Sequence, residues 1–339
     1  MTSLSVGVII CAYTLERWAD LTASVRSALE QTPAPDEVWL VVDHNDELYQ
    51  RAKLEFASAD VVQVVRNARK QGLSGARNTG VELACTDVVA FLDDDAQAQP
   101  DWLARLLNPY ADDAVIAVGG AAYPLFSAGT RRPNTLPADR TGVRGELDWI
   151  VGCTYAGQPV TAETVRNLMG CNMSFRRSVF AGAGGFAENL GRVGKTPLGC
   201  EETELCIRAT DRYPGTRIVF EPRAIVRHHV SDDRLTWRYL RRRGYAEGVS
   251  KAAVATMVAK GQALSTERTY TTQVLPRGVL RELGSAAQGN TNSRVEALAA
   301  AGAILVALGS TVFGYARATL ARSAPKPAPA PTLRMTRVD

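Results

Sequence analysis

Three consecutive aspartates, Asp93, Asp94 and Asp95, directly follow the apolar pair Phe91 and Leu92. A buried strand that ends in this way places clustered carboxylates at the carboxyl end of a sheet, where open α/β folds bind ligands. Hard carboxylate oxygens suit Mg²⁺ or Mn²⁺ bridging the phosphates of a nucleotide. The run therefore predicts a metal and nucleotide site, whereas an isolated acidic triplet would more often be a solvated turn.

A second group of residues could complete a nucleotide site at the same sheet edge. Asp43 ends an earlier strand-like run, so its carboxylate could face a nucleotide base. Arg66 ends a later run, and a Gly-rich segment at residues 72–80 then opens a helix whose free amides could approach a phosphate or ribose. This segment lacks the G-x-G-x-x-G spacing of the dinucleotide fingerprint, and a helix that needs small residues for packing explains it equally well.

Acidic residues and histidines mark two further positions. Glu201, Glu202 and Glu204 fall in the first turn of a predicted helix, where the helix dipole favours negative charge even without a function. The same dipole would keep such a carboxylate ionised and able to accept a proton from a hydroxyl. His228 and His229 end a strand-like run and supply two of the three histidines in the chain.

The elements that must position these side chains alternate along the first hundred residues. β-branched apolar runs alternate with helical spacing, which predicts βαβ units and a mostly parallel sheet. The predicted strands are residues 6–12, 37–43, 61–66 and 88–92, and the predicted helices are residues 18–28, 46–58 and 74–84. From residue 119 to about residue 165 the sequence is dominated by Gly, Pro and Thr, which predicts long loops. Strand-like runs return at residues 171–175, 217–220 and 224–230.

The composition is that of an ordinary globular protein. The chain has 339 residues, a formal net charge of +4, 46% hydrophobic residues and 22% charged residues. It has neither the concentrated basic excess of a nucleic-acid-binding protein nor the low apolar content of a disordered chain. The six cysteines lack the two-residue spacing of a zinc or redox site, so we expect reduced thiols. The N-terminus has no secretory pattern, so we expect a cytoplasmic location.

The C-terminal third predicts helices that could contact a membrane. Residues 235–260 have helical character, and a Pro/Ala-rich tail from residue 324 is expected to be disordered. Residues 297–316 form an uncharged stretch of 20 residues, which is long enough to span a bilayer. Its Ala- and Gly-rich composition also fits a buried or interfacial helix. Basic residues follow it, so a spanning helix would leave the tail in the cytoplasm beside the catalytic part.

A basic stretch with one tryptophan lies at the start of this helical third. It is either a solvated helix face or a surface that contacts a diphosphate or anionic lipid headgroups. Its members are Arg234, Trp237, Arg238, Arg241, Arg242 and Arg243.

Taken in this order, the motifs from about residue 5 to about residue 251 resemble those of a family 2 glycosyltransferase with the GT-A fold. The resemblance rests on residues 8–13, 38–43, 72–80 and 91–95 in a nucleotide half, and on residues 170–177, 184–186 and 201–208 in an acceptor half. It implies an α/β fold with a Rossmann-like, mostly parallel sheet flanked by helices and a C-terminal helical extension. The expected regions are a nucleotide-sugar-binding half at 1–118, an acceptor-binding half at 119–232, a helical region at 233–322 that could associate with a membrane, and a disordered tail at 323–339.

The resemblance also implies roles in donor binding for an inverting sugar transfer. Asp43 would bind the base, Asp93 the ribose or a metal-bound water, and Asp95 the metal itself. His228 would complete a mixed nitrogen and oxygen site for Mn²⁺ or Mg²⁺, with His229 as the alternative ligand. The metal would neutralise the charge on the departing diphosphate. Other donor contacts are expected from Ala12, Tyr13, Arg66, Gly72, Arg77, Asn78 and Asp94.

Glu202 occupies the position at which the family usually has Asp, and it would be the general base that deprotonates the acceptor. Its extra methylene moves the carboxylate by about 1 Å, which matters in a reaction that depends on positioning. Glu201 is therefore the second candidate for the base. Acceptor contacts are expected from Gly170, Asn172, Glu204, Trp237 and Arg238.

These inferences predict a metal-dependent glycosyltransferase. Its donor would be a nucleotide-diphosphate sugar, with UDP favoured, and its acceptor a hydroxyl on a glycolipid or cell-envelope glycan precursor at the inner face of the cell membrane. The alternatives are a soluble enzyme that glycosylates a secondary metabolite and a non-catalytic nucleotide-sugar-binding protein. No nucleic-acid partner is expected.

Overall fold

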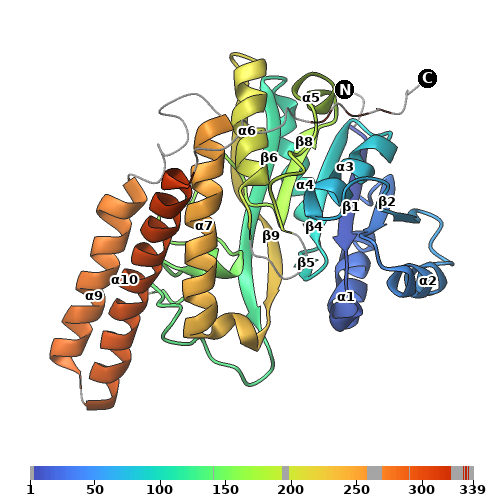
Figure 1. Ribbon diagram of the computed structural model, residues 1–339. Helices are drawn as coiled ribbons and strands as arrows, with labels where there is room; N and C mark the ends of the chain where they lie inside the picture. The colour runs from blue at the N-terminus through green and yellow to red at the C-terminus, as the bar shows by residue number, and fades with distance from the viewer. Residues whose placement is uncertain are drawn as a thin grey trace.

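A computed structural model describes residues 4–139, 141–192, 198–257, 269–289 and 291–321, together with Pro331, Leu333 and Met335. Its centre is one nine-stranded mixed sheet with helices on both faces (Figure 1). The strands follow the order β3-β2-β1-β4-β8-β6-β9-β5, and β7 pairs with β9 outside this path. The predicted α/β fold class is confirmed.

The first half of the sheet is parallel, as predicted. Its strands are β1 (Val6–Ala12), β2 (Glu37–Val42), β3 (Val62–Arg66) and β4 (Val88–Asp93). They pair in the order β3-β2-β1-β4, so their carboxyl ends meet at one edge. The strands β1 and β4 are buried almost throughout, which is typical of a parallel sheet covered on both faces.

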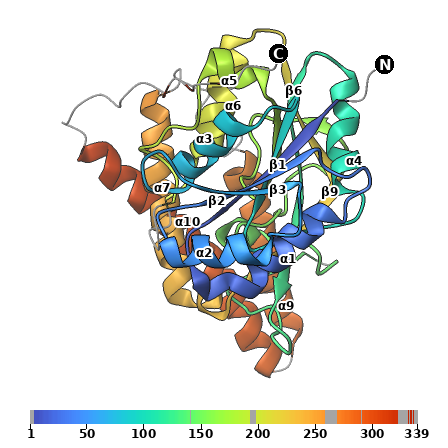
Figure 2. The same cartoon turned by 90° about the vertical axis from the view of Figure 1, so that its right-hand side faces the viewer.

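Two helical layers cover this sheet, one on each face (Figure 2). Helices α1 (Trp18–Leu29), α2 (Asp46–Glu55) and α4 (Trp102–Leu107) pack on one face. Helices α3 (Leu73–Leu83), α5 (Ser178–Ala183) and α6 (Glu201–Arg212) pack on the other. Successive residues of each strand face the two helical layers in turn, and both layers are apolar. The strands are therefore continuous apolar runs in the sequence.

The second half of the sheet is mixed and begins earlier than predicted. Strand β6 (Val115–Phe126) continues through residues 119–126, which the sequence predicted as loop. Gly119, Gly120, Ala121 and Ala122 weaken the strand pattern there. The predicted boundary between residues 118 and 119 falls inside β6, so the two halves share one sheet.

The remaining strands join the halves. Strand β8 (Asn172–Arg176) lies antiparallel between β4 and β6, and the predicted runs 217–220 and 224–230 form one strand, β9 (Arg217–Val230). The short strands β5 (Ala96–Ala98) and β7 (Glu163–Thr164) pair antiparallel with β9. Short 3-10 helices are η1 (Leu15–Arg17), η2 (Asn108–Ala111), η3 (Asp148–Val151) and η4 (Asp232–Leu235).

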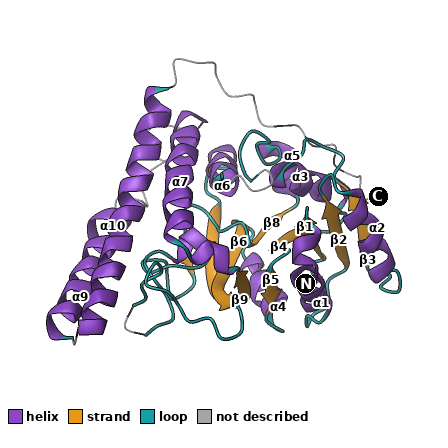
Figure 3. Ribbon diagram, turned by 60° about the horizontal axis from the view of Figure 1, so that its bottom comes forward, coloured by secondary structure: helices purple, strands orange, loops and turns teal. Residues whose placement is uncertain are grey.

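Three long helices form a layer beside the sheet (Figure 3). They are α7 (Trp237–Met257), α9 (Leu275–Gln288), which a π-helical turn η5 (Tyr270–Val274) precedes, and α10 (Thr291–Leu320). Helices α7 and α10 cross closely at Gly248, where a Cβ would lie 2.0 Å from the carbonyl oxygen of Thr311. Helix α10 is therefore packed tightly against α7.

Helix α10 is long and apolar enough to cross a membrane by length and composition. Its best 18-residue window has a mean hydropathy of 2.0, and 39% of that window is buried inside the protein. The buried side includes Ala303, Ile304 and Ala307, which pack with Leu240 of α7 and Leu275 of α9. One side of α10 therefore belongs to the protein core.

The predicted disordered tail, residues 323–339, lies mostly outside the described residues. Its three described residues correct the prediction locally, because Leu333 is only 8% exposed and packs into the core cluster that contains Phe186. The amide of Gly185 also donates to the carbonyl of Pro331 at 3.1 Å.

Candidate active site

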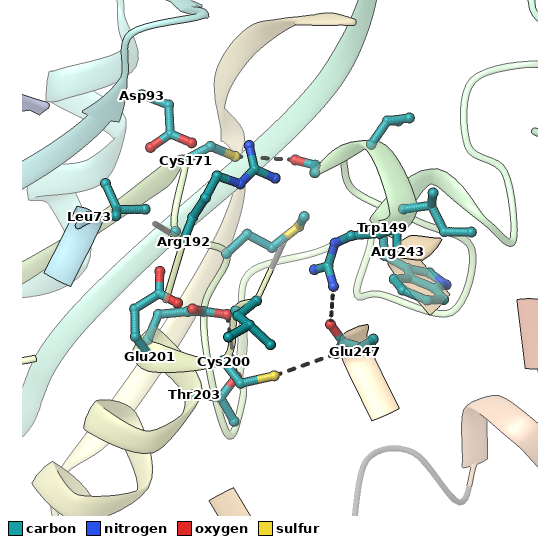
Figure 4. Close-up of a pocket in the computed structure, with 18 of the residues that line it drawn as sticks. Leu73, Asp93, Trp149, Cys171, Arg192, Cys200, Glu201, Thr203, Arg243 and Glu247 are labelled. Carbon is teal, nitrogen blue, oxygen red and sulfur yellow. Dashed lines mark hydrogen bonds and ion pairs between the residues drawn. The ribbon is translucent and has the colours of Figure 1, made fainter. Parts of the chain in front are cut away.

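A cavity of about 620 Å³ opens at the carboxyl edge of the parallel strands. Its walls combine the ends of β1 and β4, the start of α6, and the facing sides of α7 and α10. Figure 4 shows part of this cavity, with Asp93 on one side and Arg243 and Glu247 of α7 on the other. Eleven of the predicted donor, metal, base and acceptor residues line it, namely Ala12, Tyr13, Asp43, Arg77, Asp93, Asp94, Asp95, Gly170, Glu201, Glu202 and His228.

Asp43 lies just beyond β2, and its carboxylate accepts hydrogen bonds from neighbouring amide groups. Its Oδ1 accepts hydrogen bonds from the side-chain amide of Asn67 at 2.6 Å, and its Oδ2 accepts one from the backbone amide of Gly72 at 2.9 Å. The His44 Nδ1 also lies 2.9 Å from Oδ1. Gly72 thus acts on Asp43 through its amide, whereas we had expected it to contact the donor directly.

The aspartates after β4 form a dense charge cluster. Arg17 lies 2.8 Å from Asp94 and 2.6 Å from Asp95, and Arg234 lies 3.2 Å from Asp95. Burial raises the pKa of Asp94 to about 7, with Arg17 opposing this shift and Asp95 adding to it. Burial would also raise the pKa of Asp95, but His228, Arg234 and Arg17 hold it well below its usual range.

Asp93, Asp95 and His228 form a group that fits a divalent cation. One ligand atom from each lies within 4.8 Å of the others. The Nε2 of His228 is 3.0 Å from Oδ1 of Asp95, and its Nδ1 lies 3.8 Å from the sulfur of Cys153. Two carboxylates and an imidazole are donors that Mn²⁺ and Mg²⁺ accept, so the residues fit the predicted metal site.

Arg77 connects this cluster to the acidic start of α6. Its side chain is 2% exposed and donates to Glu201 at 2.7 Å, to Asp93 at 3.2 Å and to the carbonyl of Gly170 at 2.9 Å. Because all these contacts are internal, Arg77 holds the donor-side and base-side segments at a fixed separation. The other oxygen of Glu201, Oε2, is buried and has no hydrogen-bond partner among the described residues.

Glu202 lies partly buried beside Glu201 on the cavity wall. Burial, and then the neighbouring charge of Glu201, raises the pKa of Glu202 to about 8. A carboxylate with a raised pKa is a stronger proton acceptor once ionised, which suits a general base. The preceding residue, Cys200, has a left-handed backbone with φ of 68° and donates through its sulfur to Glu247 at 3.6 Å, as Figure 4 shows. This turn directs the first residues of α6 toward the cavity.

The cavity thiols are not suited to act as nucleophiles. Cys11, Cys171 and Cys200 line the cavity, and burial raises the pKa of each. A protonated thiol is a poor nucleophile. None of these three thiols is therefore suited to form a covalent intermediate.

Three residues predicted to contact the donor or the acceptor instead form hydrogen bonds or ion pairs inside the protein. Asn172 is fully buried, accepts from Trp102 Nε1 at 2.8 Å and donates to two backbone carbonyls. Asn78 is likewise fully buried and bonds both the amide and the carbonyl of Phe186. Glu204 is 2% exposed and pairs with Arg208 at 2.7 Å. Small polar residues near a motif were mistaken here for ligand contacts.

Other predicted contacts point away from the cavity. Arg66 pairs with Asp46 at 3.0 Å on the surface, and His229 lies 2.9 Å from Asp20. Trp237 and Arg238, in the first turn of α7, are exposed and do not line the cavity. Since neighbours on a strand or helix face different directions, His228 reaches the site whereas His229 does not.

Some cavity residues were not predicted. Arg17 reaches the aspartates from η1, and Arg192, nine residues before the start of α6, also lines the cavity. Arg243 was noted only as part of a basic stretch, although it pairs with Glu247 at 2.8 Å inside the cavity. An arginine, glutamate and lysine at positions 243, 247 and 251 share one helix face, and that spacing could have indicated a buried network.

Solved structures show which class of protein has this fold. A mannosyltransferase from Pyrobaculum calidifontis, solved with GDP-Man and Mn²⁺, has a TM-score of 0.59 at 18% identity, covering 96% of this chain and 89% of that one. GalNAc-T7, solved with UDP, GalNAc and Mn²⁺, has a TM-score of 0.51 at 15% identity, covering 80% of this chain and 55% of that one. The fold is that of the GT-A glycosyltransferases.

The sequence comparisons define the family. Residues 7–182 match the family described as Glycosyl transferase family 2. A glucosyl-dolichyl phosphate glucuronosyltransferase from Haloferax volcanii is 33% identical over 313 residues, which is 92% of this chain and 95% of that protein. N-acetylgalactosaminyltransferase 6 of Drosophila melanogaster is 32% identical over 55% of this chain, but over only 29% of its own length. The chain belongs to glycosyl transferase family 2 and is a glycosyltransferase.

Proposed function

We propose that this enzyme transfers a uronosyl group, with inversion, from a nucleotide-diphosphate sugar to a hydroxyl of a lipid-phosphate-linked sugar. UDP is the favoured nucleotide. The name of the Haloferax volcanii relative supports both ends of the proposal, because it specifies a glucuronosyl group and a dolichyl-phosphate-linked acceptor. That relative matches almost the full length of this chain.

One observation carries the proposal: a single cavity is lined both by the residues that fit a divalent cation and by an apolar surface of α10. At one end lie Asp93, Asp95 and His228, and at the other lie Leu308, Thr311, Val312, Tyr315 and Ala316 of α10. The α10 residues recur at helical spacing, so they form one continuous face. A polar end for a nucleotide sugar and an apolar end for a lipid chain suit the proposed pair of substrates.

Glu202 lies on the cavity wall and is proposed as the general base. It would remove the proton from the acceptor hydroxyl as that oxygen attacks the anomeric carbon of the donor. Asp43 would orient the base of the nucleotide. Arg77 would keep Asp93, at the end of β4, at a fixed distance from the start of α6. Asp93, Asp95 and His228 would hold a divalent cation, which supplies positive charge to the departing diphosphate when bound.

The outer side of the C-terminal helices is proposed to lie on the cytoplasmic membrane surface. Apolar side chains of α9 and α10 are exposed there, including Leu280, Leu283, Val295, Leu298, Leu305, Phe313 and Leu320. Because α10 also lines the cavity, a membrane at this side would bring a lipid-linked acceptor to the apolar end. An exposed apolar surface of this kind is suited to contact with a lipid surface.

A thermal-shift panel tests the donor half of the proposal. UDP, GDP, dTDP and their sugar conjugates are added with and without Mn²⁺ to the wild type and to Asp95→Asn, with Asp101→Asn as a surface control. A ligand at 100 times its Kd should stabilise the fold by about 2.7 kcal/mol. We expect stabilisation by a uridine nucleotide that requires Mn²⁺ and Asp95 but not Asp101. No nucleotide effect on the wild type would refute the proposal.

Product analysis then tests the transfer itself. A lipid-phosphate-linked glucose is offered as acceptor with UDP-glucuronate as donor. Transfer would release UDP and extend the lipid-linked sugar by one uronosyl unit. Transfer to a water-soluble acceptor alone would instead support the soluble-enzyme alternative.

A further inference from the structure

We propose that Arg192 binds the carboxylate of the donor's uronosyl group and thereby selects an acidic sugar over a neutral one. The inference rests on the proposed function, and it adds a specificity-determining residue. No family motif in the sequence contains Arg192, which lies between the residues 184–186 motif and α6.

Backbone contacts fix Arg192 to the donor side of the cavity. Its carbonyl accepts a hydrogen bond of 2.9 Å from the amide of Leu73, the first residue of α3. The preceding Gly191 has φ of +89°, and a Cβ there would lie 2.8 Å from Ser74 Oγ and 3.2 Å from Glu201 Oε2. The chain therefore passes tightly between the starts of α3 and α6, which places Arg192 next to the segment whose Gly72 amide holds Asp43.

The side chain of Arg192 extends into the cavity. In Figure 4 it rises from the wall beside Leu73 and Glu201, and its guanidinium lies on the side of Cys171. Arg243 enters the same space from the opposite wall, where it is bound to Glu247. A sugar placed between the residues that fit a divalent cation and Glu202 would come within reach of the Arg192 wall.

Arg192 differs from the other cavity cations in its pairing. Arg17, Arg77, Arg234, Arg243 and Lys251 each lie within 3.2 Å of a carboxylate oxygen. Arg166 donates to the side chain of Asn167 at 3.0 Å. Within the described part of the chain, the guanidinium of Arg192 has neither an ion pair nor a hydrogen bond. Among the described residues, the Arg192 guanidinium is therefore a positive charge on the cavity wall that has neither an ion pair nor a hydrogen bond.

A uronate carboxylate matches this charge better than the other anionic groups of the substrates. The diphosphate would face the cation held by Asp93, Asp95 and His228, with Arg17 and Arg234 nearby. A phosphate on the acceptor lipid belongs toward α10, where Arg243 and Lys251 lie on α7. A planar guanidinium can bind a carboxylate with two parallel hydrogen bonds, whereas a neutral hexose would leave the charge unpaired in a half-enclosed site.

Donor binding without acceptor provides the test. Calorimetric titrations with Mn²⁺ compare UDP-glucuronate, UDP-glucose and UDP on the wild type, Arg192→Met and Arg192→Lys. Methionine keeps an unbranched apolar stem but removes the charge, and lysine keeps the charge but loses the planar fork. Arg212→Gln, at the exposed end of α6, is the matched control.

We expect the wild type to bind UDP-glucuronate more tightly than UDP-glucose. Arg192→Met should weaken UDP-glucuronate binding about 10- to 100-fold, the range for losing a charge-assisted hydrogen bond, and should change UDP-glucose and UDP binding by about twofold or less. Arg192→Lys should give an intermediate loss for UDP-glucuronate alone. Arg212→Gln should match the wild type for all three ligands.

Other outcomes overturn the inference. Equal weakening of all three ligands would assign Arg192 to the diphosphate or to the fold, and unchanged binding would show that it contacts none of them. A wild type that binds UDP-glucose but not UDP-glucuronate would refute the uronate inference and leave a glycosyltransferase with a neutral donor. A wild type that binds no UDP compound would refute the proposed UDP donor as well.

Discussion

The buried guanidinium of Arg77 lies 2.7 Å from Oε1 of Glu201 and so joins the end of the parallel sheet to the start of α6. The same guanidinium lies 3.2 Å from Oδ1 of Asp93. Asp93 belongs to the donor end of the cavity, and Glu201 immediately precedes the proposed base Glu202. One side chain therefore fixes the separation between Asp93 and Glu201.

Replacing Arg77 by Met should destabilise the protein strongly. Glu201 would be left buried without its cation, and breaking a buried pair on one side costs about 3–5 kcal/mol. Urea denaturation followed by circular dichroism measures the change in the free energy of unfolding. The double variant Arg77→Met/Glu201→Gln should recover much of the loss, because the buried charge of Glu201 is then removed as well, whereas Asp93 is partly exposed to solvent. A single variant within 0.5 kcal/mol of the wild type, about the scatter of surface substitutions, would contradict the structural role given to Arg77.

Glu202→Gln should abolish proton abstraction while leaving donor binding intact. General-base catalysis contributes about 10²- to 10⁴-fold to the rate, so kcat should fall by that factor with the Kd for UDP nearly unchanged. Steady-state rates and nucleotide titrations check the two quantities. Glu204→Gln serves as a comparison outside the cavity. A larger loss of kcat in Glu201→Gln than in Glu202→Gln would make Glu201 the base.

The rate should also depend on the ionisation of Glu202. Its pKa is raised to about 8 by burial and by Glu201. A base works in its ionised form, so kcat/KM should rise tenfold per pH unit below pH 8 and level off above it. Replacing Glu201 by Gln removes a charge that raises this pKa, and the inflection should move to lower pH. A flat profile between pH 6 and pH 9 would be incompatible with Glu202 as the base.

The same raised pKa predicts how Glu202 affects stability. The carboxyl has an ordinary pKa of 4.5 and a pKa of about 8 in the folded protein, so between these values the folded state binds a proton that the unfolded chain does not. Stability therefore falls as pH rises through this window. Glu202→Gln cannot ionise, so its Tm should exceed that of the wild type at pH 9 and approach it at pH 4.5. A difference in Tm that is constant with pH would rule out this linkage.

The parallel half of the fold and its donor aspartates were predictable because local patterns determine them. Apolar runs buried on both faces mark β1 and β4, and the carboxyl-edge rule places Asp43 and Asp93 together. The antiparallel insertion of β8 and the continuation of β6 depend on pairing between distant segments. Such pairing leaves no periodic signal in one sequence.

The same limit applies to the site. Glu202 and His228, which line the cavity, were named from the sequence because they occupy positions that carry the family resemblance. Arg17 and Arg192 come from segments without a motif, and only the fold brings them to the cavity. Asn78 and Asn172 were overestimated, because polarity alone does not distinguish a residue that binds a ligand from one that bonds the backbone of its own core.

Metal dependence can be checked at His228. Chelation by EDTA should abolish transfer, and added Mn²⁺ should restore it. His228→Gln should raise the Mn²⁺ concentration needed for half-maximal activity by about tenfold or more, since even outer-shell partners of metal ligands cost 10- to 100-fold in affinity. His229→Gln is the matched control, because His229 pairs with Asp20 outside the cavity. Equal effects of the two substitutions would exclude His228 as a specific ligand.

Membrane association can be tested without removing α10. Deleting this helix would expose Leu240 and Leu275, so loss of binding in a truncated chain could reflect unfolding alone. Leu298 and Leu305 are 53% and 56% exposed and lie one above the other on α10. Their double replacement by Glu puts charge on the outer face without touching the buried side. We expect the wild type to float with anionic phospholipid vesicles and the double variant to remain in the aqueous fraction.

Leu54→Glu is the control for this experiment, because Leu54 is 81% exposed on α2 at the far side of the sheet. It adds the same kind of charge to an exposed leucine, yet it should leave vesicle binding unchanged. Thermal unfolding of each variant verifies that the fold is intact. Flotation of the Leu298→Glu/Leu305→Glu variant at the wild-type level would mean that this face does not contact lipid. The apolar end of the cavity would then have to receive its acceptor from solution.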